Sequence, residues 1–120
     1  MLYSTLVYLA LMQTFQFYAA NLFSLDCEKS ALLYSRLFSF SIWSKTQNHA
    51  ELRSDSGFVL FIDKPSLYCN VTPGTISFTV PELNLKEINL DPLKLESYNE
   101  KNMYVSFLDE YSNRIWVFKR

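Results

Sequence analysis

The chain has 120 residues, of which 49% are hydrophobic and 17% aromatic, and its formal net charge at pH 7 is −1. This length and apolar content predict one folded domain with a substantial core and exclude a disordered chain. The nearly balanced charge excludes the strongly basic surface that nucleic acids and anionic membranes attract. The two glycines, Gly57 and Gly74, are too far apart to form a phosphate-binding glycine loop.

The N-terminal segment differs in composition from the rest, because the first 25 residues carry no charged side chain. Residues 6–12 form an apolar stretch of the length found in secretory signal peptides, and Ser24 offers a small residue for cleavage. We therefore predict a signal peptide over residues 1–24 and a β-sandwich domain over residues 25–120. Two alternatives stay open: an uncleaved anchor, which would be the sole link to a membrane, and an element of an intracellular core.

Alternation of apolar and polar residues dominates the chain after Cys27 and predicts strands rather than helices. The continuous apolar run at 58–62 is typical of a central strand covered on both faces. The polar segment 44–56 reads as a long exposed loop. We expect strands in the following segments: 33–43, 58–62, 67–71 and 75–80.

The C-terminal part begins with three spaced Leu/Ile-rich pentapeptides between residues 83 and 97. Three copies are too few for a solenoid, so we interpret them as a bulged strand followed by another short strand. Residues 103–108 and 114–118 flank a polar five-residue segment and predict a β-hairpin. About seven strands at this spacing predict an all-β fold, a small antiparallel β-sandwich of immunoglobulin-like arrangement.

The chain has two cysteines, Cys27 and Cys69. In a secreted protein such a pair predicts one disulfide, which would stabilise the fold by about 4 kcal/mol on the chain-entropy estimate. Two buried free thiols are the alternative for an intracellular chain. Asn70-Val71-Thr72 is a glycosylation sequon, and strand alternation turns Asn70 outward, so we predict a glycan there.

Motifs for catalysis are absent from the sequence. His49 is the sole histidine and lies in a polar segment without a nucleophile motif, so it is interpreted as a solvated loop residue. Asp109 and Glu110 lie where a hairpin loop needs polar residues. The sequence therefore predicts no enzymatic activity, no metal site and no cofactor.

Aromatic side chains are abundant, with ten Phe, eight Tyr and two Trp. Dense core packing is the favoured interpretation, and the alternatives are an internal apolar pocket for a small ligand or an exposed patch for protein recognition. The candidates for that binding surface are Trp43, Tyr68, Tyr104 and Trp116.

Together these features predict a small secreted, disulfide-bonded glycoprotein that binds a protein partner, as an interaction or accessory module such as viruses direct at their hosts. A secreted carrier with an enclosed cavity for a hydrophobic small molecule is one alternative. An intracellular structural or interaction protein with residues 1–24 in its core is the other. No nucleic-acid partner is expected, and the sequence leaves the oligomeric state and the partner open.

Overall fold

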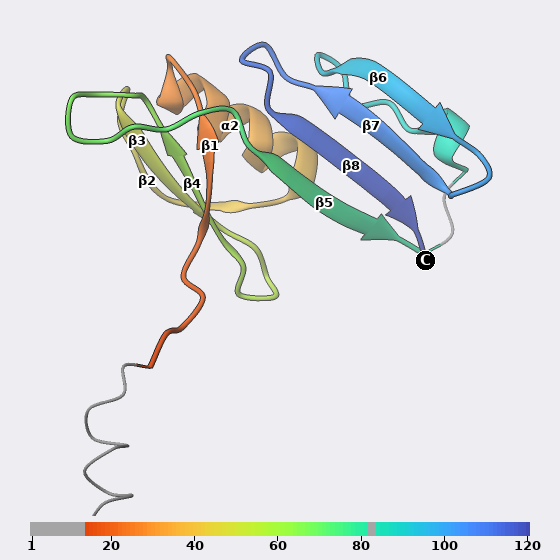
Figure 1. Ribbon diagram of the computed structural model, residues 1–120, viewed down its shortest axis with the longest axis horizontal. Coiled ribbons are helices and arrows are strands. Elements are labelled where there is room, and N and C mark those ends of the chain that lie inside the picture. Colours follow the sequence, from red (N-terminus) through yellow and green to blue (C-terminus); the bar gives the residue numbers. More distant parts are fainter. Residues whose placement is uncertain (1–13, 82–83) are drawn as a thin grey trace, which may run out of the picture.

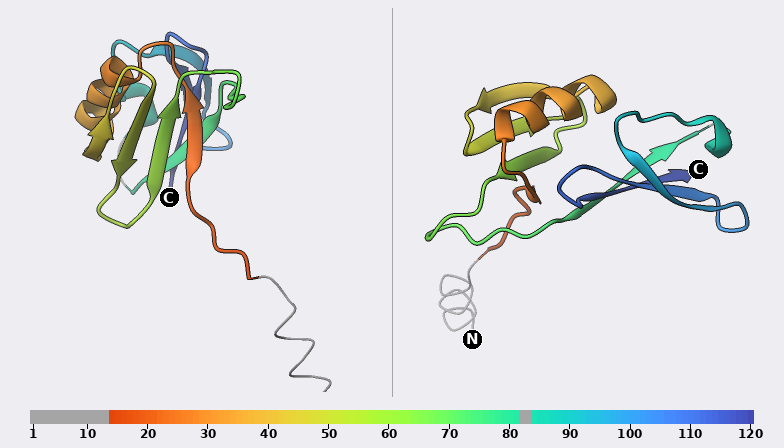
Figure 2. Two further views of the ribbon diagram at one scale, coloured as in Figure 1. Left: turned by 90° about the vertical axis from the view of Figure 1, so that its left-hand side faces the viewer. Right: turned by 90° about the horizontal axis from the view of Figure 1, so that it is seen from above.

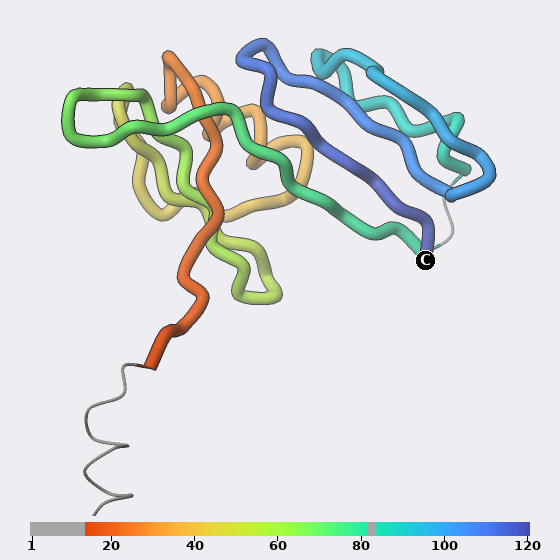
Figure 3. The backbone as a smooth tube through the Cα atoms, viewed as in Figure 1, coloured from red at the N-terminus to blue at the C-terminus, as the bar shows by residue number. Residues whose placement is uncertain are grey.

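The computed structural model describes residues 14–81 and 84–120, so most of the predicted signal peptide, residues 1–13, lies outside the described residues. The described residues form two sheets that lie side by side (Figures 1 and 3). The N-terminal half contains β1 (Ala20–Phe23), α2 (Cys27–Phe38), β2 (Ser41–Lys45), β3 (His49–Arg53) and β4 (Val59–Asp63). The C-terminal half contains β5 (Thr75–Val80), the 3₁₀ helix η1 (Leu85–Glu87), β6 (Lys94–Asn99), β7 (Tyr104–Leu108) and β8 (Arg114–Lys119).

Both halves follow the same path through their sheets. The strand orders are β1-β4-β3-β2 and β5-β8-β7-β6. In each sheet the first strand runs parallel to the last, and the other neighbours are antiparallel. Each half therefore consists of an edge strand, a connection and a three-stranded meander. The last strand of the meander lies beside the edge strand.

The predicted immunoglobulin-like sandwich of about seven antiparallel strands is therefore wrong. The described residues form eight strands, both sheets are mixed, and a helix follows the first strand. The segment 67–71, expected as a strand, is a loop, and the expected loop 44–56 contains β3. Polar residues occupy alternate positions of β3 because one face of its sheet is uncovered.

Helix α2 contradicts the strand predicted over residues 33–43, and its buried positions follow the helical period. The buried residues of α2 are Cys27, Ser30, Ala31 and Tyr34, a stripe at i, i+3, i+4 and i+7. Asp26 caps the helix by accepting a hydrogen bond from the Lys29 backbone N–H at 3.2 Å, and Ser39 ends it in the left-handed conformation. Helix α2 contacts β2, β3 and β4, and the view from above shows the helix lying over one face of the first sheet (Figure 2).

Other predicted elements are confirmed. Strand β5 spans the predicted residues, with Ile76 buried and Thr75, Ser77 and Thr79 exposed. Strand β4 lies between β1 and β3, as expected of an apolar central strand. The β7–β8 hairpin forms around residues 109–113. The bulged strand predicted within residues 83–97 is wrong for most of that segment, because its described residues form η1 and turns up to Leu93, and only β6, from Lys94, is a strand with a register shift between Leu95 and Ser97.

One side chain joins the two halves where β1, β5 and β8 meet. Asn113 is 1% exposed, and its amide oxygen accepts hydrogen bonds from the backbone N–H groups of Phe23 and Gly74 at 3.0 and 2.9 Å. Its amide nitrogen donates to the Phe23 carbonyl and to Asp109 at 2.7 and 2.8 Å. The same carboxylate oxygen of Asp109 also accepts a hydrogen bond from helix α2, where the buried Tyr34 hydroxyl donates to it at 2.7 Å. The polar side-chain groups of Asn113 are thus hydrogen-bonded at this buried junction.

The same junction places strand β1 inside the fold. Leu22 is 1% exposed, and β1 pairs with β4 along its length. Cleavage after Ser24, as predicted for a signal peptide, would remove this strand from the first sheet. No helix among the described residues has both the length and the apolar character needed to cross a membrane.

Candidate active site

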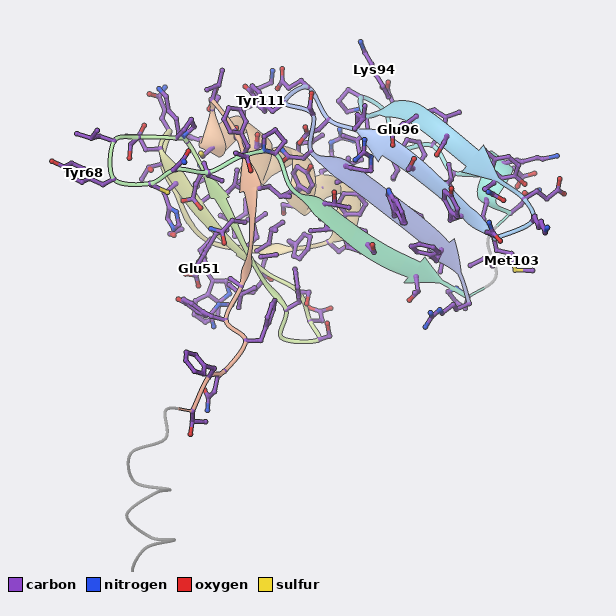
Figure 4. All side chains as sticks on the ribbon, in the orientation of Figure 1. Glu51, Tyr68, Lys94, Glu96, Met103 and Tyr111 are labelled. Carbon is purple, nitrogen blue, oxygen red and sulfur yellow. The ribbon has the colours of Figure 1, made fainter. Side chains whose placement is uncertain are left out.

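The face of the first sheet turned away from α2 carries a cluster of polar side chains at one end. Side chains alternate along a strand, so Ala50 and Leu52 of β3 pack beneath α2 while His49 and Glu51 lie on the opposite face. Glu51, labelled in Figure 4, marks that face. The register pairs His49 with Asp63 of β4, and Asp63 with Phe23 of β1.

His49 and Asp63 form a hydrogen-bonded pair, with 2.5 Å between the imidazole Nδ1 and the carboxylate Oδ1. The second carboxylate oxygen accepts a hydrogen bond from the Asn21 amide at 2.7 Å. Asp63 is 7% exposed, whereas the His49 side chain is 46% exposed. The imidazole is therefore oriented through Nδ1 by a buried carboxylate and keeps Nε2 free for another partner.

Backbone hydrogen bonds fix the strand ends that carry this pair. The His49 backbone is held in a turn by Thr46, whose backbone N–H donates to the His49 carbonyl at 2.8 Å. The Lys64 N–H donates to the Asn48 carbonyl, and the Ser24 N–H donates to the Asp63 carbonyl, each at 3.0 Å. The pair thus lies at the hydrogen-bonded ends of two inner strands rather than on a free loop.

A cavity of about 520 Å³ opens beside the pair. Its lining residues are Asn48, His49, Asp63, Lys64, Pro65, Ser66 and Cys69. Such a volume is within the usual range for small-molecule sites. The lining therefore includes one lysine, Lys64, and the oriented imidazole of His49.

The predicted disulfide does not form, because both cysteines are free. Cys27 is fully buried at the start of α2, and burial, followed by the nearby charge of Asp63, raises the pKa of its thiol to about 11. Cys69 is exposed, in the loop after β4. Cys27 is therefore an inert core residue, whereas Cys69 belongs to the wall of the cavity.

The predicted aromatic binding surface is divided between distant places. Tyr104 and Trp116 stack in the second sheet, with ring centroids 5.3 Å apart. Trp43 lies in the first sheet with the Arg53 guanidinium 3.7 Å above its ring. Tyr68 is 95% exposed at the outer end of the loop after β4 (Figure 4), and Asn70 is exposed in the same loop. The four aromatic residues therefore do not form one patch.

Sequence reasoning missed Asn21 and Asp63 as partners of His49. Asp63 directly follows the apolar run of β4, and a carboxylate at the end of a buried strand was the one available signal. Asn21 lies in the segment that we had assigned to the signal peptide. The pairing needs the register of β1, β4 and β3, which local patterns do not contain.

No family model matches the chain, and no curated protein matches it in sequence. Solved structures do match its fold. A possible glyoxalase from Bacillus cereus is 16% identical with a TM-score of 0.62, and the match covers 88% of this chain and 99% of that one. A lactoylglutathione lyase from Agrobacterium tumefaciens is 13% identical with a TM-score of 0.65, covering 88% and 93% of the two chains.

A third similar structure contains a metal. The fosfomycin resistance protein FosX from Listeria monocytogenes, complexed with Mn(II) and sulfate, is 10% identical with a TM-score of 0.64, covering 89% of this chain and 91% of that one. In the part of the present chain that the structure describes, no three His, Cys, Asp or Glu side chains group to hold a metal ion. His49 and Asp63 bond to each other instead, so these residues do not fit a metal centre of that kind.

These comparisons overturn the functional predictions. The fold is the glyoxalase fold, which enzymes use, so the predicted non-enzymatic, immunoglobulin-like module is wrong. The predicted secreted, disulfide-bonded glycoprotein is wrong as well, because both thiols are free and the fold does not support secretion or glycosylation. The alternative of a secreted carrier is wrong for the same reasons.

Proposed function

We propose that this chain is a metal-independent enzyme in which His49, oriented by Asp63, is the general base for a small molecule bound in the 520 Å³ cavity. One observation carries the proposal: a buried carboxylate holds Nδ1 of the sole histidine while its ring stays almost half exposed. This arrangement is the one that acid–base catalysis requires of a histidine.

The chemistry follows from the two ends of the imidazole ring. A hydrogen bond from Nδ1–H to Asp63 leaves the lone pair on Nε2, where it can accept a proton from a substrate. The carboxylate then stabilises the imidazolium that forms, and Asn21 keeps the carboxylate in place through its second oxygen. A positioned base of this kind contributes about 10²- to 10⁴-fold to a rate.

The substrate we infer is a small anionic compound. Lys64 is among the residues that line the cavity with His49, and the positive charge of a lysine suits a carboxylate or a phosphonate. The names of the similar proteins supply two compounds for a first test, lactoylglutathione and fosfomycin.

We place the enzyme inside the cell. Two free thiols and the packing of β1 within the first sheet support this location, because paired cysteines of a secreted domain would normally be oxidised.

The decisive experiment compares chelator-treated wild-type protein with His49→Gln and Asp63→Asn, each incubated with lactoylglutathione or fosfomycin and followed by NMR. We expect turnover of one compound by the wild type and a loss of about 10²- to 10⁴-fold in both variants. Asp55→Asn, in the exposed turn between β3 and β4, is the matched control and should retain full activity. Turnover that His49→Gln leaves intact, or that returns only when a metal is added, would contradict the proposal.

A further inference from the structure

We infer that strand β5 pairs with the N-terminal segment, residues 14–19, of a second copy of this chain, so that two chains exchange these segments in a symmetric dimer. This surface lies outside the His49 cavity and serves assembly rather than catalysis. An extended segment can add to a sheet in this way by pairing its backbone with an edge strand. Three features of the molecule point to the exchange: an unprotected edge strand, an uncharged hollow beside it and an exposed aromatic segment.

Four strands form the edges of the two sheets, and three of them are protected against pairing with another chain. Strands β2 and β6 each contain a register shift, and they carry Lys45 and Lys94. Bulges and lysines at an edge hinder the addition of a further strand. Strand β1 is closed in another way, because the Asn113 amide bonds both the N–H and the carbonyl of Phe23.

Strand β5 has none of these protections along Thr75–Val80. It contains no charged residue and no proline, and it pairs in regular register with β8. Among the described residues no strand pairs with its second edge, so the backbone N–H and C=O groups along that edge are open to another chain. In Figure 1 this edge faces the first half of the molecule, and β5 diverges from β1 along its length.

An uncharged hollow of about 590 Å³ lies along the open edge of β5. Residues 75–79 line it together with Phe38, Phe40 and Phe58, which supply aromatic surface from the first half. No charged side chain is among the described residues of this lining. The hollow therefore suits an extended segment that is apolar on one side and carries no charge.

The N-terminal segment has this character. Phe15 and Phe17 are 88% and 80% exposed, and alternation in an extended chain places them on one side, with Gln16 on the other. The first 25 residues carry no charged side chain. The rings of Phe17 and Phe58 lie 6.4 Å apart, so the segment passes the rim of the hollow. Figure 1 shows it leaving β1 away from the body of the fold, which makes a second copy the partner that receives it.

A symmetric exchange buries enough surface for a specific dimer. A buried Phe side chain removes about 150–250 Å² from water. Two rings from each chain, together with the equal area that they cover in the two hollows, bury about 1,200–2,000 Å², which is the size of specific protein interfaces. A two-fold dimer also occupies both β5 edges, so neither remains open for growth into a fibre.

Sedimentation velocity of the folded full chain tests the dimer. We expect a concentration-dependent dimer, and amide hydrogen exchange at residues 75–80 should slow as the dimer forms. The double variant Phe15→Ser/Phe17→Ser removes the donated rings, and Ser77→Lys places a charge in the middle of the β5 edge. Each should raise the dissociation constant about 100-fold or more. Leu67→Ser, which replaces an exposed apolar residue in the loop after β4, is the matched control and should leave the dimer unchanged.

Circular dichroism melting checks that the variants are folded, as expected because every substituted position is exposed. A wild type that stays monomeric up to about 1 mM would overturn the inference, and so would assembly beyond a dimer. A dimer that survives either Phe15→Ser/Phe17→Ser or Ser77→Lys would also overturn it. Slow exchange of the β5 amides in a monomer would contradict it as well, because the edge would then be covered within a single chain.

Discussion

At the scale of single residues, the chemistry of this chain depends on side chains that are distant in sequence. The sequence neighbours of His49 are polar and indicate a solvated loop residue. In the fold, the neighbouring carboxylate of Asp63 orients its imidazole ring. Asp63 follows it by 14 residues, and Asn21 lies 42 residues before Asp63. A residue type can be read from the sequence, but its role depends on the partners that the fold supplies.

The orientation of His49 can be tested without a substrate, because the chain has a single histidine. Long-range ¹⁵N–¹H NMR of the neutral imidazole should show the proton on Nδ1 and a bare Nε2, since the buried carboxylate accepts from Nδ1. In Asp63→Asn this preference should weaken or invert. A wild-type ring protonated on Nε2 would contradict the hydrogen-bond arrangement described above.

Asn113 should be among the most sensitive positions of the fold. Asn113→Ala leaves the Phe23 and Gly74 backbone groups without partners at a buried junction, at a cost of about 3–5 kcal/mol of unfolding free energy. Urea unfolding measures the loss. The exposed Asn102→Ala is the matched control, with an expected change within about 0.5 kcal/mol. Equal effects of the two substitutions would contradict the role of the junction.

Burial of Cys27 should make stability depend on pH in the alkaline range. Its thiol pKa is raised from 9.0 to about 11 in the folded chain, so the unfolded chain releases this proton first as the pH rises. The stabilisation is fully present below pH 9 and is lost between pH 9 and pH 11, by up to about 3 kcal/mol. Denaturant unfolding across this range should show a steeper decline for the wild type than for Cys27→Ala. If the unfolding free energies of the wild type and Cys27→Ala fell in parallel with pH, the thiol would not be buried in the folded chain.

At the scale of elements, local pattern was sufficient where one face of a strand is clearly apolar. It predicted β4, β5 and the β7–β8 hairpin, because each alternates or runs apolar between turn residues. It did not predict α2, because the strand-like alternation at 38–42 favoured a strand where the helical stripe that begins at Cys27 continues. It failed for β3 because residues on the uncovered face are polar. The candidate site was missed for the same reason, since it lies on that face.

Gly74 marks the point where the approach to β5 touches β1. A Cβ at this position would lie 2.7 Å from the Asn21 carbonyl oxygen, which is backbone and cannot move freely. Gly74→Ala should therefore lower the unfolding free energy by about 1–3 kcal/mol. It should also displace Asn21 from Asp63 and so reduce the rate of turnover. Ser77→Ala, on the exposed face of β5, is the control and should change neither the melting temperature nor the rate.

At the scale of the whole molecule, one core cluster runs through both halves. Phe38 at the end of α2 stacks on Phe78 of β5 with 4.3 Å between ring centroids, so α2 contacts both sheets. In the second half, the segment around η1 takes the position that α2 has in the first, and Leu85 and Leu93 pack there. The halves share a topology and depend on each other for burial.

This dependence makes the N-terminal boundary testable. A chain that begins at Leu25, the predicted mature N-terminus, lacks β1, the Asn21 amide and the Phe23 backbone groups that bond Asn113. We expect it to lose its cooperative thermal transition, whereas a chain that begins at Thr14 should melt like the full chain. Calorimetry distinguishes the two outcomes. A sharp transition in the shorter chain would show that the domain starts after Ser24.

The parallel pairing of first and last strands also governs how this chain reaches its structure. Ala20 pairs with Leu60 and Thr75 with Arg114, so each sheet closes a loop of about forty residues before its edge strand gains a neighbour. The amide of Asn113 then joins Phe23 across 90 residues. High contact order of this kind is typical of folding in milliseconds to seconds. The bond between Asn113 and Phe23 can therefore form only after the β7–β8 hairpin has been made, whereas β1 can already pair with β4.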